Sequence, residues 1–265
     1  MKIYISADIE GVAGITDWSE ADYTHPSYPQ FREEMTREVV AACEGAMAAG
    51  ATEILVKDAH HTGRNILAAQ LPACARLIRG WSGHPLAMVQ ELDESFAAVL
   101  LIGYHARAGA ESNPLAHTIS LKVAEMRING EPVSEFRLHT YAAALFGVPV
   151  AFVSGDEGLC QDVAALNGKI RGFAVSKGVG PSTISLAPER AQRGIKDGVA
   201  AALREDLAAK KVRLPDAFTL EIKYTDPVNA YKSSHYPGAR HVGGQTVRFE
   251  TGDYFEVMRA LRFIV

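Results

Sequence analysis

Acidic residues and histidines of the kind that bind metal ions follow three separate apolar runs of this chain. They are Asp8 and Glu10 after the run at 2–7, Asp58, His60 and His61 after the run at 53–57, and His105 after the run at 97–102. Carboxylates and imidazoles gathered at one point suit a borderline-soft divalent metal such as zinc. The pattern therefore predicts a metal-dependent enzyme, provided that the fold brings the three positions together.

The apolar runs have the character of neighbouring strands in a parallel α/β sheet. The run at 97–102 is apolar throughout, as expected of a strand buried on both faces. Between the first two runs, apolar residues recur at helical spacing over 31–47, and Gly50 ends that helix. The carboxyl ends of parallel strands form one edge of a sheet, and sites are built along that edge. We therefore expect the candidate ligands to lie close together.

The remaining elements predict the domain organisation. We expect a helix at 134–145, strands at 148–153 and 170–175, a long helix at 188–210, alternating strands at 218–223 and 246–250, and a helix after Asp253. The predicted fold is a three-layer αβα domain with a mostly parallel sheet over 1–185, followed by a smaller α+β domain over 186–265. Prolines and glycines interrupt the segment 66–96, which is predicted to hold loops and short elements and could pack with either domain.

Composition narrows the class of protein and its compartment. The net charge of the 265-residue chain is -4 and no cluster of lysines and arginines is present, so we expect no nucleic-acid partner. No apolar stretch reaches 18 residues, and no secretory signal begins the chain, so neither membrane insertion nor export is expected. The three cysteines are widely spaced and form no Cys-x-x-Cys pair, which indicates reduced thiols in a cytoplasmic protein.

Some candidate ligands cannot be separated from their neighbours by spacing alone. Asp8 and Glu10 are two residues apart, so both project to the same side of an extended segment and can face one metal cluster. His60 and His61 are adjacent and point to opposite sides, so one of them faces the site. Asp58 is either a ligand or a carboxylate that orients a histidine.

Four further residues are weaker candidates. Glu135 follows Ser134, the predicted N-cap of a helix, and is either a capping carboxylate or another ligand; His139 lies on the same helix face. His117 belongs to a polar loop and could act as an acid or a base. Lys177 follows a strand end among glycines, but the spacing of a phosphate-binding loop is absent.

In this order, the motifs resemble those of the zinc-dependent D-aminopeptidases of the dipeptide-transport (DppA) type. The resemblance rests on SADIEGVAG at 6–14, DAH at 58–60, LIGYHARA at 101–108, His117, INGEPVSE at 128–135 and VSGD at 153–156. It covers most of the first 180 residues and is weaker beyond them. No single motif is specific, but the combination is.

The resemblance implies a site with two zinc ions in each subunit. By matching position, the ligands would be Asp8, Glu10, His60, His105 and Glu135, with Asp8 bridging the two metals. The resemblance selects His60 over His61 and assigns no ligand role to Asp58 or His139. His117 would lie in the active site without being a ligand. Members of this family form ring-shaped decamers, so the resemblance also implies a homodecamer.

The implied reaction is removal of the N-terminal residue from short peptides, with a preference for D-amino acids such as D-alanine. A hydroxide activated between the two zinc ions would attack the scissile carbonyl. His117 would donate a proton to the leaving amine or stabilise the oxyanion, and Lys177 is a weaker candidate for the oxyanion or the substrate carboxylate.

There are two alternatives to the aminopeptidase function. The first alternative is another dinuclear metal hydrolase, acting on a non-peptide amide, an ester or a phosphoester. Apart from Arg107, no basic residue near the ligand motifs could neutralise a phosphate. The second alternative is a dipeptide carrier of a transport system, which would be exported, whereas this chain shows no signal.

Overall fold

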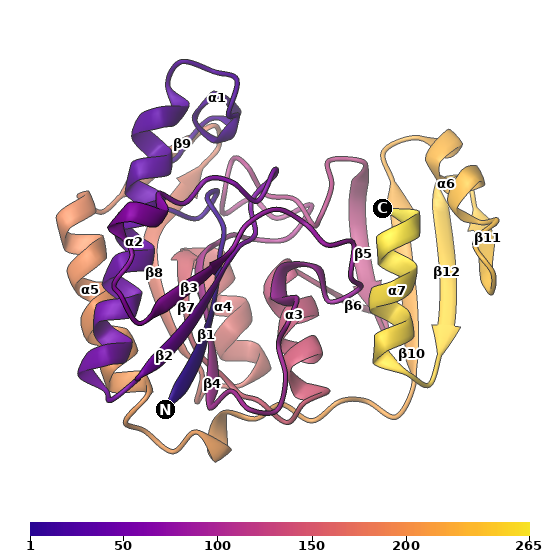
Figure 1. The fold of residues 1–265 in the computed structure, drawn as a ribbon. Helices are drawn as coiled ribbons and strands as arrows, with labels where there is room; N and C mark the ends of the chain where they lie inside the picture. Colours follow the sequence, from indigo (N-terminus) through magenta and orange to yellow (C-terminus); the bar gives the residue numbers. More distant parts are fainter.

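Seven strands form a sheet that is parallel except at its last strand (Figure 1). The computed structural model describes residues 1–265. In spatial order the strands are β3 (Ala75–Ile78), β2 (Glu53–Asp58), β1 (Lys2–Ala7), β4 (Ala98–Tyr104), β7 (Val150–Asp156), β8 (Arg171–Val179) and β9 (Ser182–Ser185). Ile5 of β1 is in register with Val56 of β2 and Leu100 of β4. The carboxyl ends of β2, β1 and β4 are therefore adjacent.

Helices cover both faces of this sheet and make three layers (Figure 1). Helices α2 (Tyr28–Ala48) and α5 (Pro188–Ala202) lie on one face, and α3 (Glu135–Ala144) and α4 (Glu157–Leu166) on the other. Strand alternation divides the core accordingly, because Ile3 and Ile5 pack toward α2 and α5 whereas Tyr4 packs on the opposite side. The prediction of a three-layer αβα unit is confirmed. None of these helices, nor any other in the structure, is long and apolar enough to cross a membrane.

A second, antiparallel sheet lies beside the first unit (Figure 1). Its strands, in spatial order, are β11 (Ala239–Gly243), β12 (Thr246–Thr251), β10 (Phe218–Tyr224), β5 (Val123–Ile128) and β6 (Glu131–Pro132). Helices α6 (Pro227–Ser233) and α7 (Tyr254–Ile264) pack on it. The hydroxyl group of Tyr254 donates a hydrogen bond of 2.7 Å to the carbonyl of Leu138 in α3, which joins α7 to the first unit. The smaller α+β unit is thus confirmed.

The two units exchange elements across the predicted boundary at residue 185. Strands β5 and β6 precede that boundary but pair with β10, and α5 follows it but packs on α2. We propose that residues 123–132 and 214–265 form the second unit and that 188–202 belong to the first.

Two predicted segments differ in detail from the structure. The helix predicted at 188–210 ends at Ala202, and Ala208–Lys210 forms a separate 3-10 turn. The buried Lys210 donates to Glu205 at 2.7 Å, a contact that holds this turn. In the segment 66–96, β3 joins the first sheet, whereas Leu86 and Val89 enter the core that both units share.

Glu38 of α2 is a buried carboxyl group outside any ion pair. Its Oε1 atom accepts a hydrogen bond of 2.9 Å from the Ala13 amide, and its Oε2 atom has no hydrogen-bond partner in the protein. Burial raises the pKa of Glu38 from 4.5 to about 8. Between those two values the folded protein binds a proton that the unfolded chain has released. Glu38 therefore lowers stability progressively as the pH rises from 4.5 to 8.

Replacing Glu38 with Gln should remove this pH dependence. We expect the free energy of unfolding of Glu38→Gln, relative to that of the unsubstituted protein, to increase between pH 5 and pH 8 by up to about 1.4 kcal/mol per pH unit. Thermal unfolding followed by circular dichroism at several pH values measures this difference. Glu44→Gln, a half-buried position on the same helix whose carboxylate pairs with Lys196 at 2.9 Å, is the control. Parallel curves for Glu38→Gln and the unsubstituted protein would show that Glu38 does not hold its proton.

Candidate metal centre

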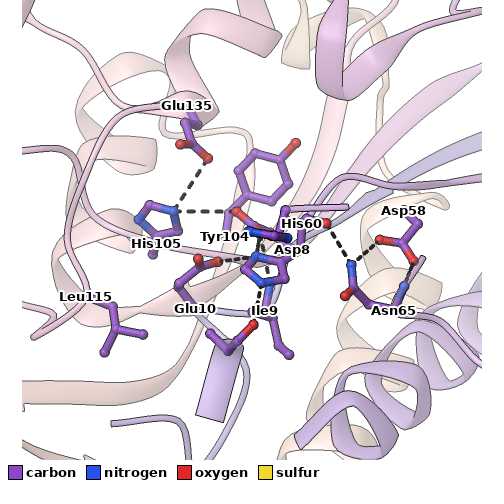
Figure 2. Close-up of polar contacts among 12 residues, drawn as sticks. Asp8, Ile9, Glu10, Asp58, His60, Asn65, Tyr104, His105, Leu115 and Glu135 are labelled. Carbon is purple, nitrogen blue, oxygen red and sulfur yellow. Dashed lines mark hydrogen bonds and ion pairs between the residues drawn. The ribbon is translucent and has the colours of Figure 1, made fainter. Parts of the chain in front are cut away.

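Five buried side chains converge at the carboxyl edge of the parallel sheet (Figure 2). They are Asp8 and Glu10 from the loop after β1, His60 from the loop after β2, His105 at the end of β4, and Glu135 at the first position of α3. None of the five is more than 6% exposed. The structure thus brings together side chains that are as far apart in sequence as residues 8 and 135.

Asp8 lies between two histidines and directs one oxygen toward each (Figure 2). Its Oδ1 is 3.3 Å from His60 Nδ1, and its Oδ2 is 3.5 Å from His105 Nε2. Glu10 Oε2 is 3.1 Å from the same nitrogen of His60, and Glu135 Oε2 is 3.5 Å from the same nitrogen of His105. The cluster therefore has two halves, each with its own histidine and glutamate, that share the carboxylate of Asp8.

A backbone carbonyl orients each histidine. His60 Nε2 is 2.8 Å from the Ala21 carbonyl oxygen, and His105 Nδ1 is 2.9 Å from that of Ala106. When one ring nitrogen donates its N–H to a carbonyl, the other can present a lone pair. In both rings that second nitrogen faces the carboxylates, an arrangement typical of metal-binding histidines.

The donor atoms fit a divalent metal. Glu10 Oε2 and His105 Nε2 are buried and have no hydrogen-bond partner in the protein, although buried polar atoms are normally paired. His105 can form close metal-binding groups with Asp8 and Glu10 on one side and with His117 and Glu135 on the other. Carboxylates and imidazoles, with no cysteine, match the donor set of catalytic zinc.

Charge is concentrated in this cluster. Burial, together with the negative charge of Glu10, raises the pKa of Asp8 from 3.8 to about 6. Burial also opposes ionisation of Glu135, but the neighbouring His105 outweighs it and lowers the pKa of Glu135 to about 2. Burial lowers the pKa of His60 and His105, but the adjacent carboxylates raise both well above 6.5. Three carboxylates thus depend on nearby positive charge, which a divalent cation supplies when it displaces the imidazole protons.

Asp58 orients the loop that carries His60. Its two oxygens accept hydrogen bonds from the backbone amides of Asn65 and Ile66 and from the Asn65 side chain, at 2.5, 2.7 and 2.7 Å (Figure 2). The Asn65 side chain also donates to the His60 carbonyl at 2.7 Å. His61, with a φ of 44°, makes no ion pair with the cluster, and its ring packs 5.3 Å from that of Tyr23. Asp58 thus supports His60 and takes no place among the converging donors.

His139 and Lys177 also lie outside the cluster. The Nδ1 atom of His139 is 2.7 Å from the Glu135 carbonyl oxygen, a contact within α3. Lys177 pairs with Glu157 at 3.2 Å and lines a different cavity. Neither Lys177 nor Arg107 lines the cavity above the cluster.

His117 lies at the edge of the cluster. Its ring stacks on that of His105, with 4.3 Å between centroids, and its Nε2 is 3.7 Å from Glu135 Oε1. The Nδ1 atom is 2.9 Å from the Leu115 carbonyl oxygen, so this ring is oriented in the same way as the other two. The edge of Trp18 also packs against His117. His117 therefore combines a fixed orientation with access to the cavity.

A cavity of about 820 Å³ opens above the cluster. Asp8, Glu10 and Glu135 are among its buried members, whereas Trp18, Trp81, Leu121 and Arg262 are among its more exposed ones. Its volume is within the usual range for sites that bind small molecules. No sequence motif marks Trp18, Trp81 or Arg262, because they reach the cavity from segments that only the tertiary fold brings together.

An α/β sheet whose carboxyl edge gathers buried carboxylates and imidazoles under such a cavity is typical of metal-dependent hydrolases. Comparison with known proteins identifies the family to which the chain belongs. The chain belongs to the D-aminopeptidase family of peptidases (M55), whose family model matches residues 1–263.

Two relatives show how far the similarity extends. A D-aminopeptidase of Bacillus subtilis (strain 168) is 32% identical over 263 residues, which cover 98% of this chain and 95% of that protein. The solved structure of the zinc-dependent D-aminopeptidase DppA from Bacillus subtilis, described as a self-compartmentalizing protease, has a TM-score of 0.94 and 31% identity. That similarity covers 100% of this chain and 96% of the other.

Proposed function

We propose that this chain is a dizinc aminopeptidase that removes the N-terminal residue, chiefly a D-residue such as D-alanine, from short peptides. The observation that carries the two-metal site is Asp8, whose two oxygens face histidines on different loops. In this proposal Asp8 would be a ligand of both metals. His60 and Glu10 complete one site and His105 and Glu135 the other.

The residues of the cluster have distinct tasks in hydrolysis. When bound, zinc supplies Lewis acidity for the scissile carbonyl and allows water to lose a proton near neutral pH. The floor of the cavity would receive the amino terminus of the peptide, because an unprotonated amine can bind a zinc ion held by the carboxylates. His117 moves a proton at Nε2 to the leaving amine, because its Nδ1 is engaged by the Leu115 carbonyl. Trp18 packs on His117 and limits its movement.

The assembly and the compartment form part of the same proposal. The solved relative is described as self-compartmentalizing, which supports a homo-oligomer for this chain. We propose a ring-shaped homodecamer whose active sites face an interior chamber. The three cysteines are free, which supports a reducing compartment such as the cytoplasm.

The proposed activity predicts hydrolysis of D-alanyl-p-nitroanilide, with little or none of the L form. Chelation should abolish the release of p-nitroaniline, and zinc should restore it, because the cluster holds the metal that activates water. Absorbance of p-nitroaniline measures the rate for both substrates, before and after chelation. Metal-loaded protein that cleaves neither anilide, but cleaves an ester or an aryl phosphate, would contradict the proposal and favour another metal hydrolase.

A further inference from the structure

Arg262, near the end of α7, lines the cavity above the metal centre. It is the only lysine or arginine among the lining residues. Helix α7 belongs to the second unit, yet its carboxyl end lies toward the loops of the first (Figure 1). The rings of Phe255 and His84, 5.9 Å apart, bring α7 against a cavity-lining loop. The second unit therefore contributes the guanidinium group of an arginine to the cavity above the metal centre.

The guanidinium group of Arg262 has no carboxylate partner within the chain. Its neighbour Arg259, one turn earlier in α7, pairs with Glu256 at 2.9 Å. The ion pairs made by arginines elsewhere in the chain do not include Arg262. Arg262 is exposed, so its five N–H donors remain available to a ligand in the cavity.

The metal centre and Arg262 together define the orientation of a bound peptide. In the proposed function Asp8, Glu10 and Glu135 hold zinc at the floor, where the free amine of the substrate would bind. A short peptide carries one charge of each sign, at opposite ends. An arginine recognises a carboxylate through two parallel hydrogen bonds, which a neutral amide cannot reproduce.

We propose that Arg262 binds the terminal carboxylate of the substrate, so that the preferred substrates are short peptides with a free carboxyl end. This role rests on the proposed aminopeptidase function and adds a specificity determinant on the second unit. The cavity has a volume of about 820 Å³. Only a short peptide can therefore bind the metal centre with its amino end and Arg262 with its carboxyl end inside this cavity.

The test compares D-alanyl-D-alanine with its C-terminal carboxamide. For the zinc-loaded protein we expect a KM at least about 10-fold lower for the free acid, the size of a charge-assisted pair. Arg262→Ala should raise KM for the acid by about 10- to 100-fold, with kcat and the kinetics on the carboxamide nearly unchanged. Arg262→Lys should restore part of the affinity for the acid, because it keeps the charge but loses the two-pronged geometry.

A binding measurement complements the kinetics. Calorimetric titration with the reduced-bond analogue of D-alanyl-D-alanine, in which a methylene replaces the scissile carbonyl, should show the same selective loss in Arg262→Ala. The matched control is Arg259→Ala, on the same helix but paired with Glu256 and outside the cavity lining. It should leave the affinity and KM for both acid and carboxamide unchanged.

The possible failures can be distinguished. An unsubstituted protein with equal KM for acid and carboxamide would overturn the role of Arg262 and leave the aminopeptidase function intact. Equal losses on both substrates in Arg262→Ala would show a structural effect and overturn the role as well. If zinc-loaded protein hydrolyses neither peptide nor D-alanyl-p-nitroanilide, the proposed function itself is wrong, and the carboxylate role is overturned with it.

Discussion

Asp8→Asn is expected to hold fewer than two zinc ions per chain and to lose at least about 100-fold in activity. The substitution preserves the shape of the side chain but replaces one oxygen with an amide nitrogen that cannot bind a metal. In the structure each oxygen of Asp8 faces a different histidine, at 3.3 and 3.5 Å. Loss of either oxygen therefore removes a metal ligand from one half of the cluster. Zinc content measured by elemental mass spectrometry after desalting gives the stoichiometry.

Asp58→Asn is the matched control for this experiment. Asp58 is also buried and ends the neighbouring strand, but its oxygens are occupied by the loop that carries His60. We expect this variant to lose stability and to retain two zinc ions when saturated. Full occupancy of both sites in Asp8→Asn would show that Asp8 is not the bridge, whatever the effect on activity.

The position of the cluster was predictable from the sequence because the order of the strands determines which loops lie next to one another. Apolar runs at 2–7, 53–57 and 97–102 become β1, β2 and β4, whose carboxyl ends are adjacent in a parallel sheet. Residues after those runs must then lie near one another, whatever the details of their loops. The three-layer fold follows from the same alternation of apolar runs and helical periodicity.

Other features depend on geometry that residue spacing does not contain. His61 has a left-handed φ of 44°, a local backbone geometry that spacing does not contain, so spacing alone could not choose between His60 and His61. Strand β5 pairs with β10, about 90 residues later, and its amphipathic pattern would suit either sheet. Trp81 reaches the cavity wall under the ammonium group of Lys57, 3.9 Å from the ring centre. Such contacts are specified by tertiary packing.

His117→Ala is expected to keep both zinc ions and to lose at least about 100-fold in kcat, the usual contribution of a general acid or base. The structure makes this a sharp test, because His117 Nε2 lies 3.7 Å from Glu135 Oε1, close enough for the residue to be a ligand instead. Zinc content and steady-state kinetics on D-alanyl-p-nitroanilide separate these roles. A ligand would lose metal together with activity, whereas a proton donor would lose only activity.

The control for this variant is His61→Ala, which removes another histidine from the wall of the same cavity. His61 takes no part in the ion pairs of the carboxylates, so its loss should change kcat only a few-fold. Near-normal turnover in His117→Ala would reject the catalytic role, and loss of one zinc ion would make His117 a sixth ligand. Proton transfer requires a ring that is oriented yet accessible, and His117 meets both conditions. Its Nδ1 is engaged by the Leu115 carbonyl, and its ring borders the cavity in which the leaving amine must form.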